Sequence, residues 1–348
     1  MSRPGYGLAI FATLLALVVV MLGAYTRLTH AGLGCPDWPG CYGFLGVPMS
    51  ERAQAVALLR FPDAPVEVAK GWNEMVHRYL AGLLGLVILA LALHAMQWRS
   101  RLGQPLRLPI LLLGLVILQA AFGMWTVTLK LWPQVVVAHL LGGFATLALL
   151  FLLSVRLSGR LPPVPAAPFS LRLLAWLVLL LLIGQISLGG WVSANYAALA
   201  CIDLPTCHGQ WWPAMDFTNG FHVTQEKGPN YLGGQLDGEA RTAIHVAHRL
   251  GALLVSLGVL LLAWRLRAAA LRGLSALLLL MLAVQLSLGI ANVLLHLPLS
   301  VAVAHNAGAA ALLLVLVLIH YRLRRPAAVL LVRPLPMRGD GAPEGALP

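Results

Sequence analysis

Charged side chains are scarce in this sequence. Lysine, arginine, aspartate and glutamate together make up only 10% of its 348 residues, whereas 59% of the residues are hydrophobic. The mean hydropathy is +0.84. No soluble domain could hide so much apolar surface from water, so the composition excludes a water-soluble globule and predicts a polytopic membrane protein.

Acidic residues are the scarcer charged class, with 12 acidic against 24 basic residues and a formal net charge of +12. The excess alone would suit a nucleic-acid-binding protein, but its distribution along the chain does not. With a cytoplasmic N-terminus, the cytoplasmic segments hold 15 basic and 2 acidic residues, and the opposite side holds 9 basic and 10 acidic residues. This pattern follows the positive-inside rule, so we expect cytoplasmic termini and no nucleic-acid partner.

Eight apolar runs are long enough to cross the roughly 30 Å hydrocarbon layer of a membrane. They lie near residues 7–28, 75–97, 108–129, 134–155, 171–193, 242–264, 273–295 and 299–320. The first run matches the fifth in an internal repeat, so we expect a membrane span there and not a signal peptide.

The second half of the sequence repeats the first. Cys201 lies 166 residues after Cys35, and His248 lies 171 residues after His77. Four spans in each copy give both copies the same orientation. We therefore predict two tandem four-helix bundles related by a pseudo-two-fold axis along the membrane normal. The expected parts are residues 1–160, residues 161–325, and a disordered cytoplasmic tail at residues 326–348.

The only four cysteines form two close pairs in loops 29–73 and 196–241, on the side opposite the cytoplasm. Disulfides persist in such oxidising compartments, and each pair is separated by five residues. We predict the disulfides Cys35–Cys41 and Cys201–Cys207 as structural clips. A redox role for one pair and metal binding with His208 stay open as alternatives.

Four histidines lie a few residues inside apolar runs, at matched positions of the repeat: His77, His139, His248 and His305. Ionisable side chains in a membrane usually mark function. The four should lie at similar depth, and the second and fourth helices of each half could face each other. Facing imidazoles suit a heme ligated on both faces, whereas zinc needs more ligands in one cluster. Arg78 and Arg249 could pair with heme propionates, with interfacial snorkelling as the alternative.

The two halves differ close to these histidines. Glu74 lies three residues before His77, on the same helical face, and its counterpart is His245. A carboxylate at a membrane boundary is costly unless it is hydrogen-bonded or transfers protons, so Glu74 is the candidate catalytic residue. An acid at a helix N-terminus is the alternative. Arg27 likewise has Ser193 as its counterpart.

Two further residue types match between the halves and are expected to pack the helices together, with a glutamine hydrogen bond across helices as the alternative. They are Gln119 with Gln285, and Gly123 with Gly289.

The motifs GAYTRLTHAGLGCPDWPGC, EMVHR, VVVAH, HVAHR and VAVAHNAG occur in that order and closely resemble the heme A synthase family, over about residues 8–322. The resemblance implies a membrane enzyme that oxidises a porphyrin methyl of heme O to a formyl group by successive hydroxylations, for cytochrome oxidase biogenesis. It implies that His77 and His139 hold the substrate heme, and that His248 and His305 ligate a resident heme b. Glu74 matches the acidic residue assigned to catalysis.

We expect the protein in a bacterial inner membrane, with the cysteine loops in the periplasm. Expected partners are the heme O substrate, a membrane electron carrier, heme O synthase and cytochrome oxidase assembly factors, and the sequence allows homo-oligomers. The same four histidines would also suit a diheme b-type electron-transfer protein or a heme transporter. A thiol–disulfide enzyme would leave them unexplained, and Glu74 favours the oxidising enzyme.

Overall fold

The computed structural model describes residues 3–100, 103–161 and 167–324, so the predicted tail at 326–348 lies outside the described residues. Regular structure within these ranges is helical, apart from the isolated bridges Cys41–Phe44 and Cys207–Gln210. The predicted all-α class is confirmed.

Eight helices of the described chain are long and apolar enough to cross a membrane, which confirms the predicted number of spans. They are α1 (Tyr6–Leu28), α3 (Val68–Gln97), α4 (Arg107–Thr128), α5 (Pro133–Ser158), α6 (Phe169–Ala194), α8 (Gly238–Ala268), α9 (Arg272–Leu294) and α10 (Leu299–Leu323). The short helices α2 (Glu51–Arg60) and α7 (Phe217–Gly220) lie in loops between them.

Helices α3 and α8 begin before the predicted apolar runs, at Val68 and Gly238. Both continue through polar residues outside the hydrocarbon layer, which hydropathy alone cannot assign to a helix. The start of α8 is capped by Asp237, whose side chain accepts a hydrogen bond from the amide of Ala240 at 2.8 Å.

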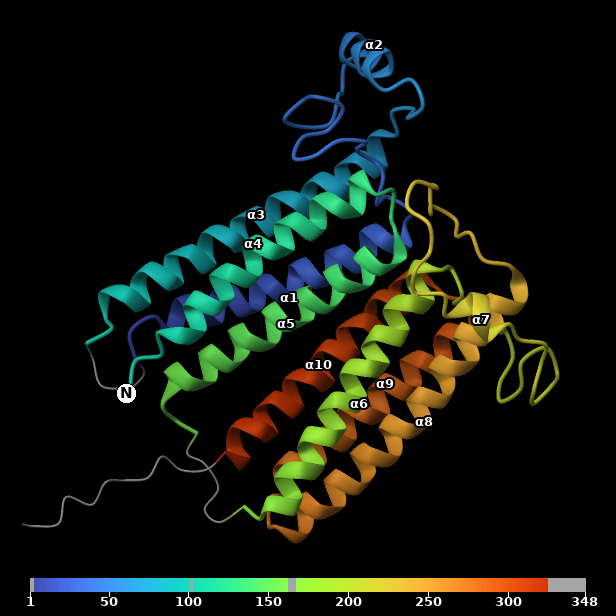
Figure 1. The fold of residues 1–348 in the computed structure, drawn as a ribbon. Coiled ribbons are helices and arrows are strands. Elements are labelled where there is room, and N and C mark those ends of the chain that lie inside the picture. The colour runs from blue at the N-terminus through green and yellow to red at the C-terminus, as the bar shows by residue number, and fades with distance from the viewer. Residues whose placement is uncertain (1–2, 101–102, 162–166, 325–348) are drawn as a thin grey trace, which may run out of the picture.

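The spans form two groups of four (Figure 1). In the first, α1 and α4 each contact both α3 and α5; in the second, α6 and α9 each contact both α8 and α10. Within the described residues α3 and α5 are therefore diagonal to each other, and so are α8 and α10. The groups meet through α1 with α10, α5 with α6, and α5 with α10. Exchanging the groups leaves this set of contacts unchanged. The pseudo-two-fold axis and the domain boundaries stay predictions.

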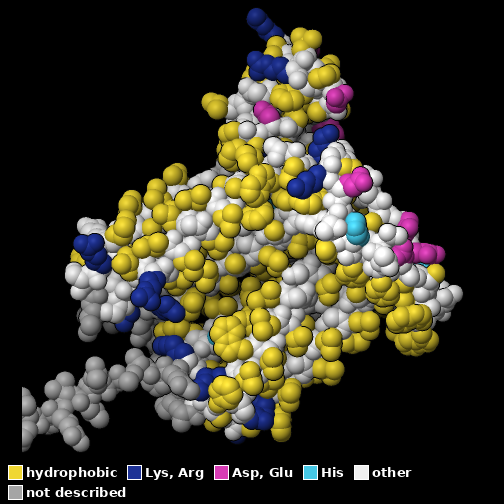
Figure 2. Space-filling model, viewed as in Figure 1, with side chains coloured by type: hydrophobic (Ala, Val, Ile, Leu, Met, Phe, Trp, Pro, Cys, Tyr) yellow, Lys and Arg dark blue, Asp and Glu magenta, His cyan; other side chains and the backbone are white. Residues whose placement is uncertain are grey.

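The two ends of the bundle differ in charge. One end carries residues 29–67 and 195–237 and is called the loop end; every acidic residue of the described chain lies there. At the opposite end, called the arginine end, all charged residues among those described are basic. They are Arg3, Arg99, Arg107, Arg156, Arg160, Arg172, Arg265, Arg267, Arg272, Arg322 and Arg324. Figure 2 shows hydrophobic side chains covering the surface between the two ends. This surface suits contact with lipid tails.

Small residues let the helices approach closely. Ala9 and Ala12 of α1 are fully buried in the core that both groups share. Gly190 of α6 lies against α5, where a Cβ atom would be 2.9 Å from Leu140 and 3.4 Å from Val137. A side chain at this position would push the two groups apart.

Replacing Gly190 by leucine should therefore destabilise the protein. Overpacking of a close contact costs about 1–3 kcal/mol, so Gly190→Leu should lower the thermal unfolding midpoint of the purified protein in detergent. The matched control is Gly184→Leu on the same helix, since nothing lies within 4 Å of a Cβ atom there. Equal midpoints for the two variants would contradict the proposed close contact.

Candidate functional site

The histidines predicted to face each other come together in the structure. His77 of α3 lies near His139 of α5, and His248 of α8 lies near His305 of α10. These helices are the diagonal ones of each group, so the imidazoles approach each other across the interior of the bundle. Each group thus contains one pair of imidazoles inside an apolar helix bundle.

Each of the four imidazole rings packs against a glycine of an adjacent helix. A Cβ atom on the glycine would be 3.1–3.5 Å from the ring carbon Cε1 in every case. The pairs are Gly23 with His77, Gly123 with His139, Gly189 with His248, and Gly289 with His305. Gly123 and Gly289 were expected to serve packing, whereas Gly23 and Gly189 were missed although they too lie 166 residues apart. The glycines form a cradle that fixes where each ring can lie.

Three of the imidazoles have a buried ring nitrogen without a hydrogen-bond partner: Nδ1 of His77, His139 and His305. An unpartnered polar atom is costly in an apolar interior, so a ligand that engages these rings would stabilise them. The described residues contain no group of three or more histidine, cysteine, aspartate or glutamate residues able to hold a metal ion. Two imidazoles per site fit the axial positions of a heme iron better than a tetrahedral ion.

Glutamine side chains contact the histidines of the second group. Nε2 of Gln185 lies 3.1 Å from Nδ1 of His248 and donates a hydrogen bond to the His248 carbonyl oxygen at 2.9 Å. Nε2 of Gln285 lies 3.3 Å from Nε2 of His305. The amides therefore restrict both rings of this pair.

The first group has no such contacts among its described residues. The repeat counterpart of Gln185 is Val19, and Gln119, the counterpart of Gln285, packs against Gly142. Gln285 was expected to pack helices or to bond across them, and its contact with His305 on the next helix fits the second expectation. Gln185 was missed. The signal that would have revealed Gln185 is the replacement of an aliphatic residue by an amide in otherwise matching segments.

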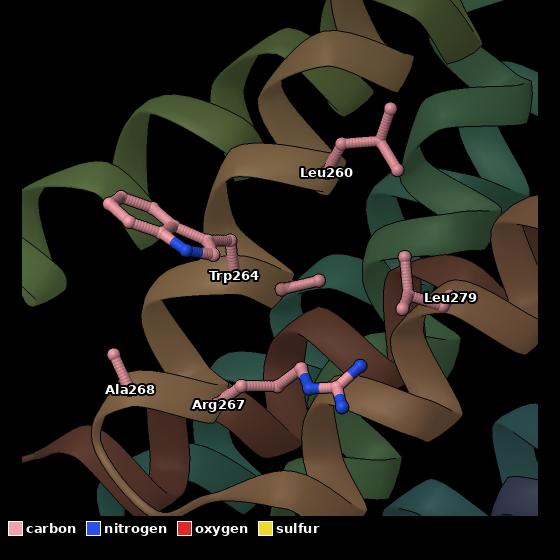
Figure 3. A pocket seen from close by; sticks show the side chains of 6 residues that line it. Leu260, Trp264, Arg267, Ala268 and Leu279 are labelled. Atoms are coloured by element: carbon pink, nitrogen blue, oxygen red, sulfur yellow. The ribbon is translucent and has the colours of Figure 1, made fainter.

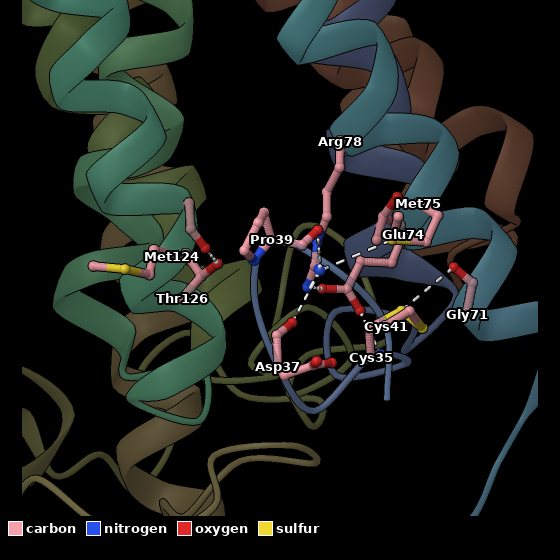
Figure 4. Close-up of polar contacts among 12 residues, drawn as sticks. Cys35, Asp37, Pro39, Cys41, Gly71, Glu74, Met75, Arg78, Met124 and Thr126 are labelled. Atoms are coloured by element: carbon pink, nitrogen blue, oxygen red, sulfur yellow. Dashed lines mark hydrogen bonds and ion pairs between the residues drawn. A yellow bond between two sulfur atoms is a disulfide. The ribbon is translucent and has the colours of Figure 1, made fainter. Parts of the chain in front are cut away.

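Glu74 is buried and both of its carboxylate oxygens are hydrogen-bonded (Figure 4). Oε2 accepts a hydrogen bond from the amide of Cys35 at 2.9 Å, and Oε1 lies 2.5 Å from Nη2 of Arg78. Cys35 can come this close because Gly34 lies against α3, where a Cβ atom would be only 2.5 Å from the carbonyl carbon of Lys70. The first turn of α3 contains no acidic residue, so the alternative that Glu74 is an N-terminal acid of a helix is wrong.

The second group holds a different residue at this position. His245 is buried, and its Nδ1 lies 2.9 Å from the carbonyl oxygen of Ala197. It therefore satisfies the loop backbone without placing a negative charge beside His248.

Arg78 and Arg249 anchor the cysteine loops to the helices. Arg78 donates hydrogen bonds to the carbonyl oxygens of Asp37, Pro39 and Gly40 as well as pairing with Glu74 (Figure 4). Arg249 donates hydrogen bonds to the carbonyl oxygens of Cys201, Asp203 and Thr206 at 2.8–3.1 Å. Both guanidinium groups therefore bind the loop backbone. Snorkelling would instead place them in water at the membrane interface. Nε of Arg249 is buried and has no hydrogen-bond partner.

Both predicted disulfides are present. The Sγ–Sγ distances are 2.00 Å for Cys35–Cys41 and 2.03 Å for Cys201–Cys207. The alternative that Cys207 binds a metal with His208 is therefore wrong for the bonded pair, because its thiolates are not available.

In each disulfide turn, an aspartate carboxylate accepts hydrogen bonds from backbone amides of the same turn. Asp37 accepts hydrogen bonds from the amides of Tyr42 and Gly43 at 2.6 and 2.7 Å. Asp203 accepts hydrogen bonds from the hydroxyl of Thr206 and from the amides of Gly209 and His208, which lower the pKa of Asp203 to about 2. Bonds to the charged form stabilise it, so this turn keeps its carboxylate ionised through the physiological pH range.

Arg27 links the two groups at the loop end. Its guanidinium donates a hydrogen bond to the carbonyl oxygen of Ser193 at 2.6 Å and lies 4.1 Å from the centre of the Tyr196 ring. The Tyr196 ring in turn stacks on His30. Arg27 and Ser193 are counterparts in the repeat, so the guanidinium of one copy contacts the matching position of the other copy directly.

The second large loop also reaches across to the first group (Figure 1). Nε1 of Trp132 donates to the carbonyl oxygen of Gln225 at 3.1 Å, and the amide of Tyr231 donates to the carbonyl oxygen of Lys130 at 3.0 Å. The α4–α5 turn, directly before the helix that carries His139, is therefore covered by chain from the other half.

The chain is similar in sequence to a known protein family and to several of its members. The model of the cytochrome oxidase assembly protein family matches residues 6–317. The heme A synthase of Shewanella oneidensis is 48% identical over 266 residues, which cover 75% of this chain and 79% of that protein. The heme A synthase of Methylobacterium radiotolerans is 34% identical, over 58% of this chain and 60% of that protein. That of Halalkalibacterium halodurans is 27% identical, over 62% and 69%.

Removing the Arg249 guanidinium should loosen the second disulfide loop. Hydrogen bonds to a charged group contribute about 1.5–3 kcal/mol each, and tenfold faster exchange corresponds to about 1.4 kcal/mol. In Arg249→Gln, hydrogen exchange measured by mass spectrometry should be at least about tenfold faster at residues 201–209. Arg265→Gln, at the other end of α8, is the matched control and should leave this loop unchanged. Unaltered exchange in Arg249→Gln would contradict the anchoring role.

Proposed function

Because this chain belongs to the cytochrome oxidase assembly protein family, we propose that it is a heme A synthase, a multi-pass membrane enzyme that oxidises a methyl group of heme O to a formyl group. Several of the relatives it matches bear that name. The observation that supports this function most directly is structural. Two histidine pairs lie in similar bundles, but among the described residues only the first has a buried carboxylate, Glu74, three residues from its histidine.

The two histidine pairs have different roles in this proposal. His77 and His139 hold the substrate heme O, and His248 and His305 ligate a resident heme b. The contacts of Gln185 and Gln285 support this division, because they restrict the second pair, which suits a group that stays bound. When bound, heme b supplies one-electron redox chemistry, which would carry electrons from the substrate towards a membrane electron carrier.

Arg78 and Arg249 are the candidate partners of the heme propionates. Each follows a proposed heme ligand directly in sequence, inside a helix, and its guanidinium reaches the cysteine loop. Arg249 keeps a buried, unpartnered Nε atom, which supports this role. Arg78 already pairs with Glu74, so a propionate bound there would lie close to the carboxylate.

Glu74 handles protons during the oxidation. Converting a methyl into a formyl group releases protons from carbon, and a positioned carboxylate can accept them. Arg78 and the amide of Cys35 hold the side chain in place, and two hydrogen bonds leave further lone pairs on its oxygens for a proton. The Cys35–Cys41 turn thereby positions the carboxylate as well as closing the loop.

We further propose that the protein lies in the bacterial inner membrane, with the arginine end in the cytoplasm and the loop end in the periplasm. The charge difference between the two ends supports this orientation. The periplasm is oxidising, which agrees with disulfides in both loops. Heme O synthase and cytochrome oxidase assembly factors are the proposed partners, since they would supply the substrate and use the product.

The direct test is pigment analysis after co-expression with a heme O-producing enzyme. Extracted hemes are separated by chromatography, and the host carries no other source of heme A. We expect heme A in cells that contain this chain. Recovery of heme O alone would contradict the enzyme and leave the diheme electron carrier, whereas exchangeable heme without a product would indicate a transporter.

Replacing Glu74 by glutamine should abolish most heme A formation while the resident heme stays bound. General acid–base catalysis contributes about a hundredfold or more to rates, so heme A yield should fall by at least that factor. The matched control is Glu67→Gln, which removes an exposed acid that pairs with Lys70 near the same end of α3. Undiminished yield in Glu74→Gln would remove Glu74 from the mechanism.

Replacing the histidines separately should distinguish the two sites. His248→Ala should lose the b-type absorbance of the purified protein, since one axial ligand of the resident heme is gone. His77→Ala should retain this absorbance but lose binding of heme O. The reverse pattern would exchange the roles of the two halves, and an unchanged spectrum in both variants would contradict ligation by these residues.

A further inference from the structure

A groove opens between α8 and α9 at the arginine end, on the same helix as His248 but towards its opposite end (Figure 3). Its volume is about 450 Å³. The residues that line it are Leu260, Ala263, Trp264, Arg267, Ala268 and Leu279. Leu260 and Trp264 are 50% and 62% exposed, so the groove lies on the outer surface of the bundle. Both helices are membrane spans, and this surface therefore meets lipid.

The lining changes in polarity along α8. Leu260, Trp264 and Arg267 are spaced so that they share one face of the helix, and they follow one another towards the arginine end. An aliphatic side chain is followed by an indole and then by a guanidinium. A phospholipid shows the same order, with an acyl chain, an interfacial glycerol region and a phosphate, and tryptophan prefers the interfacial level.

The Arg267 guanidinium is free to bind an anion. Within the described residues it has no ion pair and no hydrogen bond, whereas the neighbouring Arg265 donates to the hydroxyl of Ser170. Arg272 begins the next helix and adds positive charge nearby. All acidic side chains of the described chain lie at the loop end, so none competes for these arginines.

We propose that this groove binds one anionic phospholipid of the inner leaflet. The acyl chain packs on Leu260 and Leu279, the Trp264 indole lies at the interface, and the phosphate pairs with Arg267. The first half cannot form the same site, because the repeat counterparts of Trp264 and Arg267 are Leu93 and Met96. The protein therefore has one such site per chain, and a bound lipid would join the ends of α8 and α9 at their connecting turn.

The test uses the full chain purified in mild detergent. Native mass spectrometry counts the bound lipid during titration with dioleoylphosphatidylglycerol or dioleoylphosphatidylcholine. We expect one phosphatidylglycerol per chain and weaker binding of phosphatidylcholine. Arg267→Gln should weaken phosphatidylglycerol binding about tenfold, or about 1.4 kcal/mol, and phosphatidylcholine binding less, because the choline group already offsets the charge of that phosphate. Arg267→Lys, which keeps the charge, should retain more of the preference.

The matched control is Arg265→Gln, on the same helix but bonded to Ser170 and outside the groove. It should bind phosphatidylglycerol as the unmodified chain does. Equal affinity of Arg267→Gln and the unmodified chain would overturn the proposal, and so would equal affinity for the two lipids. Displacement of the lipid by inorganic phosphate at matched concentration would show an anion site without acyl recognition, which also contradicts it. The lipid preference of the unmodified chain decides the question even if a variant fails to fold.

Discussion

A helix bundle surrounded by hydrocarbon offers no water to a buried imidazole, and this constraint explains most of the arrangement described above. Each histidine nitrogen needs a partner from the chain or from a ligand. The chain supplies few: His77, His139 and His305 all keep an unpartnered Nδ1 atom. Glycines on adjacent helices hold the rings in place across the bundle interior. A pair of positioned imidazoles that keep unpartnered ring nitrogens is a donor set that suits a bis-histidine heme.

The repeated scaffold acquires its function at the few positions where the copies differ. Glu74 against His245 places a carboxylate in one half alone, and Gln185 against Val19 restricts a histidine in the other. Arg27 contacts its own counterpart, Ser193, and so ties the halves together at the end where both sites lie. Because the backbone framework is shared, these differences would, in the proposed function, separate a site for chemistry from a site for electron transfer without a second fold.

Much of this architecture could be predicted from the sequence because its causes are local or repeated. Apolar runs predict the spans, and the nearly constant offset between the halves predicts the histidine pairs and both disulfides. The early starts at Val68 and Gly238 were missed because polar residues continue these helices beyond the apolar runs. The contacts of Arg78 with loop carbonyl oxygens were missed for another reason. Backbone carbonyls carry no sequence signal, so only the folded loop shows that Arg78 anchors it and positions Glu74.

Resonance Raman spectroscopy of the purified, heme-loaded protein tests most directly whether the paired imidazoles share an iron porphyrin. Two axial imidazoles make a six-coordinate, low-spin heme, and the account predicts its marker bands for the resident heme of the unmodified chain. A five-coordinate, high-spin spectrum, or a pure preparation that contains no iron tetrapyrrole, would contradict it.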